Sequence, residues 1–183
     1  MGQEKEKLSN CERISVPQCN FKKFKEVFIY ILNKVGTKDN VGQTVLYKLL
    51  YFIDFNYYEL YEEQLIGAKY IKNTYGPTPV DFIKILEEMQ KNGDCEKTNR
   101  PYFRHDQTKY SSKRLADLSV LSKQEIKHID DVLEKYSDKS ANELSELSHK
   151  DIPWIIAKDG EAIDYESVFY RTDDTSVRKY GDD

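Results

Sequence analysis

Two stretches near the start of the chain repeat apolar residues at the spacing of an α-helix. The first covers residues 21–35 and is followed by Gly36, a residue type that commonly terminates helices. The second covers residues 41–61, and apolar or aromatic side chains surround almost its whole circumference. A helix that is apolar on nearly every side must be covered by other elements. We therefore predict that residues 41–61 form the central helix of the fold.

The β pattern is short and is interrupted by glycine and proline. Residues 69–74 are predicted as a strand, and Tyr75, Gly76, Pro77 and Pro79 as the turn that ends it, because proline donates no amide to a β-ladder. A helix is predicted over residues 78–91. Residues 95–110 then predict two more short strands, with residues 69–74 as their candidate pairing partner.

Two further helix starts show serine followed by glutamate at capping-box spacing: Ser122 with Glu125, and Ser140 with Glu143. The predicted fold class is α+β and predominantly α-helical, a compact bundle around a central apolar helix with a small antiparallel β element. A length of 183 residues fits one domain. We place it at residues 21–171, with residues 1–20 as a flexible N-terminal extension and residues 172–183 as a flexible C-terminal tail.

The charge balance decides which partners are expected. The net charge is −4, whereas nucleic-acid binding usually requires a surplus of basic residues. A protein partner is therefore favoured, and nucleic acid is the weaker alternative. The alternative function is a transcriptional regulator that binds through a basic N-terminal region, although a solvated lead-in explains that region better. Its basic residues are Lys5, Lys7, Arg13, Lys22, Lys23 and Lys25.

Catalytic and metal-binding signatures are missing from the sequence. There is no glycine-rich phosphate loop, no nucleophile elbow and no zinc-binding cysteine spacing. We therefore expect no enzymatic activity, no cofactor and no metal. No apolar run approaches the length of a membrane span, and the start of the chain lacks the apolar core of a signal peptide, so a cytoplasmic location is expected.

The three histidines lie far apart in the sequence. His105 falls in a polar loop, and His128 is predicted on a solvated helix face. His149 ends a capped helix, where it is expected to cap the helix while Trp154 fills the core. Catalysis by His149 is the competing hypothesis, but it lacks an identified partner group.

An aromatic stripe on the central helix is the candidate partner-binding surface. It comprises Tyr47, Tyr51 and Tyr58, with Phe55 in the narrow strip predicted to face water. Tyrosine is enriched at protein interfaces because it combines a large ring with a polar tip. The opposing interpretation places all four residues in the core.

Three segments in register resemble the Panacea domain, also called the SocA-like antitoxin domain, of bacterial and phage-associated proteins. They are residues 48–54 (KLLYFID), residues 67–77 (GAKYIKNTYGP), and residues 146–154 (ELSHKDIPW) with residues 157–160 (AKDG) following. The resemblance spans about residues 24–169. It implies a small, mostly helical fold and gives structural roles to the motif residues Lys48, Asp54, Gly76, Pro77, His149 and Trp154.

The resemblance also implies a function. It indicates an antitoxin of a type II-like toxin–antitoxin pair that neutralises a cognate protein toxin by direct binding. It supplies no catalytic residues, and it does not specify the contact surface. The negative charge favours a basic toxin by electrostatic steering. Whether the chain also forms a homo-oligomer stays open.

Overall fold

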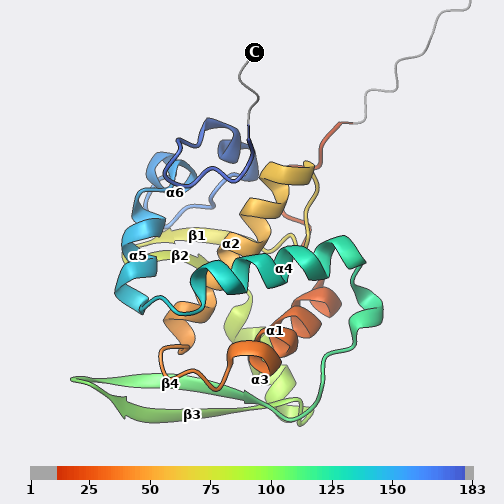
Figure 1. Ribbon diagram of the computed structural model, residues 1–183, viewed down its shortest axis with the longest axis vertical. Helices are drawn as coiled ribbons and strands as arrows, with labels where there is room; N and C mark the ends of the chain where they lie inside the picture. The colour runs from red at the N-terminus through yellow and green to blue at the C-terminus, as the bar shows by residue number, and fades with distance from the viewer. Residues whose placement is uncertain (1–11, 180–183) are drawn as a thin grey trace, which may run out of the picture.

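The computed structural model describes residues 12–179, and residues 1–11 and 180–183 lie outside the described part (Figure 1). The predicted α+β, mainly helical fold class is confirmed. The elements in chain order are α1 (Phe21–Val35), α2 (Gln43–Tyr61), β1 (Tyr70–Asn73), β2 (Gly76–Pro79), α3 (Phe82–Lys91), β3 (Cys95–Tyr102), β4 (His105–Ser112), the 3-10 helix η1 (Leu118–Val120), α4 (Lys123–Tyr136), α5 (Ala141–His149), α6 (Ile152–Ile156) and the 3-10 helix η2 (Tyr165–Tyr170).

Helix α2 is the centre of the molecule. It runs behind α4 in Figure 1, with α1 and α3 below it and β1, β2, α5 and α6 to its left. Every residue from Lys48 to Glu59 is buried. The all-round apolar pattern of this helix therefore predicted its position correctly. Among the described residues, no helix is long and apolar enough to cross a membrane.

The β-strands form two separate antiparallel pairs, β1 with β2 and β3 with β4. The predicted pairing of residues 95–110 with residues 69–74 is wrong, because each segment instead forms a local hairpin with the strand beside it in sequence. Gly76 and Pro77 were predicted as the turn, but they begin strand β2 opposite Asn73 and Lys72. The turn itself is Thr74 and Tyr75, and Gly76 follows it with a φ of 117°, a conformation that glycine adopts without strain.

Both predicted capping boxes are confirmed, at Ser122 with Glu125 and at Ser140 with Glu143. The prediction for His128 on α4 is wrong. This side chain is buried, and its Nε2 lies 2.9 Å from the carbonyl oxygen of Ile53. Burial lowers the pKa of His128. It packs there because α4 lies directly against α2, so a helix face that carries charged neighbours still presents His128 to the core.

Asp54 ties α2 to the loop that leads into β1. Its carboxylate accepts backbone N–H bonds from Ile66 at 2.8 Å, Gly67 at 3.1 Å and Ala68 at 3.3 Å, and a hydroxyl bond from Tyr70 at 2.8 Å. Burial raises the pKa of Asp54 to about 6, against the opposing effect of these four donors. Asp54 thus has a structural role, because its carboxylate accepts hydrogen bonds from three loop N–H groups that are shielded from water.

A buried charge cluster anchors the end of the described chain to α2. Arg171 donates to Asp151 at 2.8 and 2.9 Å, and to Glu59 at 3.0 Å. All three side chains are fully shielded from solvent. Thr175 donates to Asp151 at 2.8 Å, and the backbone N–H of Val177 donates to Glu59 at 3.0 Å. Packing therefore continues past residue 171, where we predicted a flexible tail to begin.

The described part of the predicted N-terminal extension also lies against the domain. The side-chain amide of Gln64 donates to the carbonyls of Ile14 and Val16 at 2.7 and 2.8 Å. Arg13 binds Glu62 and Glu166. Residues 12–20 thus follow the surface formed by the end of α2 and by η2, within the segment that we predicted as a flexible extension.

We expect Arg171→Met to lower the free energy of unfolding by about 3 to 5 kcal/mol, because it leaves the carboxylates of Asp151 and Glu59 buried without their cation. Chemical denaturation of the variant and the wild type measures this loss. Lys158→Met, which removes an exposed cation, serves as the control and should change stability little. Equal stabilities for Arg171→Met and the wild type would contradict the role given to this cluster.

Candidate partner-binding site

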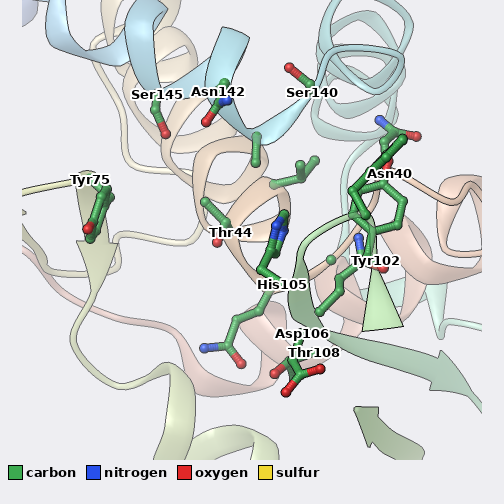
Figure 2. A pocket seen from close by; sticks show the side chains of 16 residues that line it. Asn40, Thr44, Tyr75, Tyr102, His105, Asp106, Thr108, Ser140, Asn142 and Ser145 are labelled. Atoms are coloured by element: carbon green, nitrogen blue, oxygen red, sulfur yellow. The ribbon is translucent and has the colours of Figure 1, made fainter. Parts of the chain in front are cut away.

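A pocket of about 790 Å³ lies where four elements meet. Its walls come from the tip of the β3–β4 hairpin, the β1–β2 turn, the start of α2 and the start of α5. Figure 2 shows Asn142 and Ser145 of α5 on one side, Tyr75 of the turn beside them, and His105 of the hairpin facing Thr44 of α2. The pocket therefore combines polar inner walls with an aromatic rim.

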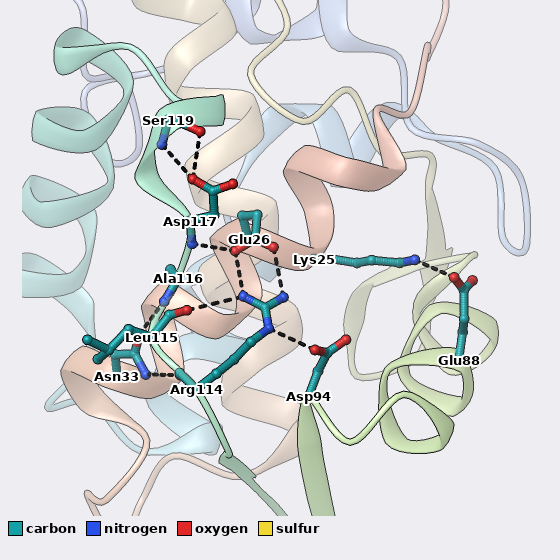
Figure 3. Close-up of polar contacts among 10 residues, drawn as sticks. All are labelled: Lys25, Glu26, Asn33, Glu88, Asp94, Arg114, Leu115, Ala116, Asp117 and Ser119. Carbon is teal, nitrogen blue, oxygen red and sulfur yellow. Dashed lines mark hydrogen bonds and ion pairs between the residues drawn. The ribbon is translucent and has the colours of Figure 1, made fainter.

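The base of the hairpin is fixed to α1 by an arginine clamp (Figure 3). Arg114 follows β4, and its guanidinium donates to both carboxylate oxygens of Glu26 at 2.9 and 2.7 Å and to Asp94 at 2.7 Å. Glu26 also accepts the backbone N–H of Asp117 at 2.6 Å. These charge-assisted bonds hold both ends of the hairpin in one orientation.

The middle of the hairpin is fixed to the loop between α1 and α2. The ammonium group of Lys109 donates to the carbonyl oxygens of Gly36, Lys38 and Val41 at 3.0, 2.6 and 2.9 Å. The side chain of Gln107 packs on Gly42, where a Cβ atom would approach it to 2.6 Å. Only the tip of the hairpin then projects beyond these attachments.

The hairpin tip presents an aromatic side chain in an unfavourable backbone conformation. Phe103 occupies the two-residue loop with a φ of 54°, a region that bulky residues avoid, and its side chain is 88% exposed. Its ring contacts that of Tyr102, with centroids 4.6 Å apart. Tyr75, across the pocket, is 77% exposed. Strained residues and exposed aromatic rings tend to occur at functional surfaces.

The four residues predicted as the partner-binding stripe do not line this pocket. Tyr51, Phe55 and Tyr58 are fully buried, and the hydroxyl groups of Tyr51 and Tyr58 donate to Asp151 at 2.6 Å and to Glu166 at 3.0 Å. Tyr47 is half-buried against Phe82. The expectation that Phe55 faces water is wrong, because η2 covers that side of α2 and stacks Tyr165 on the Phe55 ring.

Motif residues from three distant segments do come together. Gly76 packs against both Lys48 and Ser148, since a Cβ atom at Gly76 would lie 2.5 Å from Cε of Lys48 and 2.7 Å from Oγ of Ser148. His149 and Trp154 stack with ring centroids 4.4 Å apart, and Lys72 lies over the Trp154 ring at 4.3 Å. Trp154 is half-buried at the edge of the core, so it covers the core and does not fill it as predicted. The shielded Nε2 of His149 and Nε1 of Trp154 have no hydrogen-bond partner among residues 12–179.

Lys48 is a buried cation without a counter-ion. Only 1% of its surface is exposed, and within the described part of the chain its ammonium group has no hydrogen bond or ion pair. Burial lowers the pKa of Lys48 to about 8. A buried ammonium group without an anion or hydrogen-bond acceptor destabilises the fold. Because strongly shifted pKa values are frequent at functional sites, Lys48 is a candidate for a functional role.

The basic N-terminal residues that the structure describes are largely neutralised. Lys23 pairs with Glu125 at 2.6 Å, Lys25 pairs with Glu88, and Arg13 pairs with two glutamates. Lys5 and Lys7 lie outside the described residues. The described part of this region therefore offers little positive charge for nucleic acid. Residues 12–179 also contain no group of His, Cys, Asp and Glu side chains that could hold a metal ion.

A family model described as antitoxin SocA-like, Panacea domain, matches residues 46–155, more than half of the chain. The chain belongs to this family. The resemblance predicted from the sequence is thereby confirmed, and it indicates an antitoxin-type function. No curated protein and no solved structure matches the chain. The matched Panacea domain region runs from α2 to α6 and includes the whole β3–β4 hairpin, whereas α1, η2 and Arg171 lie outside it.

The sequence interpretation missed Phe103, Tyr75 and Tyr102 as surface residues of this Panacea domain. A signal was present, because an aromatic residue stood where a two-residue hairpin loop favours glycine or asparagine. The register that places Phe103 in the loop became visible only with the paired strands.

We expect Phe103→Asn to raise the free energy of unfolding by about 0.5 to 1 kcal/mol, because asparagine tolerates a positive φ better than phenylalanine. Thermal or chemical denaturation measures the change. Leu115→Asn is the control, since Leu115 is 81% exposed and has no positive φ. A loss of stability on Phe103→Asn would show that the ring stabilises the hairpin and would contradict a surface role.

We expect Lys48→Met to raise the free energy of unfolding at pH 7 by up to about 3 kcal/mol, the cost of lowering the pKa from 10.5 to about 8. Between pH 8 and pH 10.5, Lys48 keeps its proton in the unfolded chain but has released it in the folded chain. The free energy of unfolding of the wild type therefore rises with pH in this range. The advantage of the variant should therefore shrink between pH 8 and 10. Denaturation of both proteins across this range tests the sign, with Lys69→Met as an exposed control.

Proposed function

We propose that this chain is an antitoxin that neutralises a cognate protein toxin by binding it directly, in the cytoplasm of a bacterium. The observation that supports the proposal is the aromatic rim of Phe103, Tyr102 and Tyr75 around the pocket. Family membership supports an antitoxin-type function. The rim supplies exposed aromatic anchors beside a polar cavity, the composition typical of binding hot spots.

The binding mechanism follows from how the β3–β4 hairpin, which carries Phe103 and Tyr102, is attached to the rest of the domain. Arg114 and Lys109 hold the hairpin by charged hydrogen bonds, so Phe103 and Tyr102 are presented with little conformational freedom left to lose on binding. A protrusion of the toxin inserts between Phe103 and Tyr75, and the body of the antitoxin then covers the surface around that protrusion. Neutralisation by occupation of a surface requires no catalytic step and no cofactor from this chain.

The test is co-expression with the toxin encoded by the neighbouring gene. Growth should be restored by the wild-type antitoxin, and the pair should co-purify. The double variant Phe103→Asn with Tyr75→Ala should melt at or slightly above the wild-type temperature, because Phe103→Asn relieves backbone strain. It should lose binding by about 30-fold or more, the effect of removing a hot-spot anchor. Binding is measured by calorimetry on the purified proteins.

Tyr170→Ala is the matched control, because this tyrosine is 74% exposed on η2 and lies outside the pocket. It should bind the toxin as the wild type does. Equal binding by the double variant and the wild type would exclude the rim as the docking surface. A pair that never associates, together with salt-sensitive binding of the antitoxin to promoter DNA, would instead favour the transcriptional regulator.

A further inference from the structure

Strand β3 has an open outer edge. Within residues 12–179, β3 pairs with β4 alone, and it lies along the outside of the molecule at the bottom of Figure 1. Residues 96–99 are all exposed. The open edge of a strand presents unpaired backbone N–H and C=O groups, which can bind a further strand. The outer edge of β3 is therefore a candidate interaction surface.

The hydrogen-bond register shows which backbone groups point outward. The N–H of Lys113 donates to the carbonyl of Asp94 at 2.9 Å, and the register of the hairpin sets these two residues opposite each other. Opposed pairs in an antiparallel ladder alternate between hydrogen-bonded and non-hydrogen-bonded pairs. The even-numbered residues of β3 therefore bond to β4, whereas Lys97 and Asn99 direct their backbone N–H and C=O groups to the outer edge. These groups have no hydrogen-bond partner in the described part of the chain.

The outward groups fit a second copy of the same strand in one antiparallel register. When Lys97 lies opposite Asn99 of the second copy, each outward N–H of these residues meets a carbonyl of the other chain. Sliding one strand by two residues in one direction sets the two Lys97 side chains opposite each other, which is unfavourable. Sliding it in the other direction sets Lys97 opposite Pro101, which has no N–H. The sequence of the edge thus selects a single register.

The side chains of the other face match in this same register. Glu96 lies opposite Arg100 of the second copy, and Thr98 lies opposite its own equivalent. Opposite charges and paired threonines both stabilise antiparallel sheets. Within their own chain, Glu96 pairs with Lys113 at 2.7 Å and Arg100 pairs with Asp39 at 3.3 Å, so the second copy extends two existing ion pairs. The edge is therefore self-complementary, as a two-fold interface requires.

We propose that two copies of this chain pair through the outer edges of β3, about a two-fold axis at Thr98, and form a continuous four-stranded sheet. The proposal concerns this chain alone and does not depend on the antitoxin function. The pairing is short, because Pro101 closes the edge at one end and the chain enters β3 from α3 at the other. A short edge buries little surface, so the dimer is reversible, with a Kd in the micromolar range.

Thr98→Cys tests the register. Opposed residues of a non-hydrogen-bonded pair have Cα atoms about 4.5 Å apart, which a disulfide can span. Under mild oxidation this variant should form a covalent dimer, measured on non-reducing gels. Ser111→Cys, at an exposed position on β4, is the matched control and should give no more covalent dimer than the wild type with its native cysteines. Equal yields from Thr98→Cys and Ser111→Cys would overturn the proposed pairing.

Lys97→Pro and Lys97→Ala test the backbone groups of the edge. Both variants lose the same exposed side chain, but only proline also removes the outward N–H, which makes no bond to β4. In sedimentation equilibrium over a concentration series, Lys97→Ala should dimerise as the wild type does. Lys97→Pro should dimerise about 30-fold more weakly, because the dimer loses two hydrogen bonds, one from each copy. Thermal denaturation of dilute samples should give the three proteins similar melting temperatures.

The outcomes separate the homodimer from other uses of the edge. A chain that stays monomeric over the whole series would overturn the proposal, as would equal dimerisation by Lys97→Pro and Lys97→Ala. If the isolated chain is monomeric and Lys97→Pro alone loses the co-expressed toxin, the edge binds a strand of the toxin and the homodimer is overturned. A dimer that responds as expected, in a chain that binds no toxin, would support this proposal and contradict the proposed function.

Discussion

The complete enclosure of helix α2 is the constraint on which the rest of the structure depends. A helix covered on all sides has no solvated face for its polar residues, yet Lys48, Asp54, Asn56 and Glu59 are all buried on it. Each polar group must find a partner inside the protein or impose a cost. Asp54 binds the loop before β1, and Asn56 and Glu59 bind Arg171. The connections around the helix are thus held in place by its own buried polar groups.

Lys48 is the exception, and its position explains why. The segment around it faces the junction of the β1–β2 turn and α5, where Gly76 and Ser148 leave room for the ammonium group without neutralising it. The other buried polar residues of α2 have hydrogen-bond partners inside the protein, whereas Lys48 has none among the described residues and burial lowers its pKa. The partnered polar groups thus lie toward the end of the helix, and the charge without a partner lies nearer its start.

Periodic patterns predicted much of the fold. The apolar repeat located α1 to the residue, the all-round pattern located α2 at the centre, and the serine–glutamate spacing located α4 and α5. The candidate site could not be found in this way. Phe55 and Tyr58 were taken for a surface because η2 is remote in sequence, and Phe103 was missed because its exposure depends on strand register. Long-range packing decides such cases, and a local pattern contains no information about it.

The buried cluster around Arg171 bears on how such a domain is transferred between proteins. The region that defines the family ends at residue 155, whereas the guanidinium that neutralises Asp151 and Glu59 comes sixteen positions later. A fusion or a minimal fragment cut at the family boundary would retain both carboxylates in the interior and discard their cation. The region that the family model recognises is therefore shorter than the segment in which both buried carboxylates have their cation. An engineered fusion has to include Arg171 to keep this charge cluster complete.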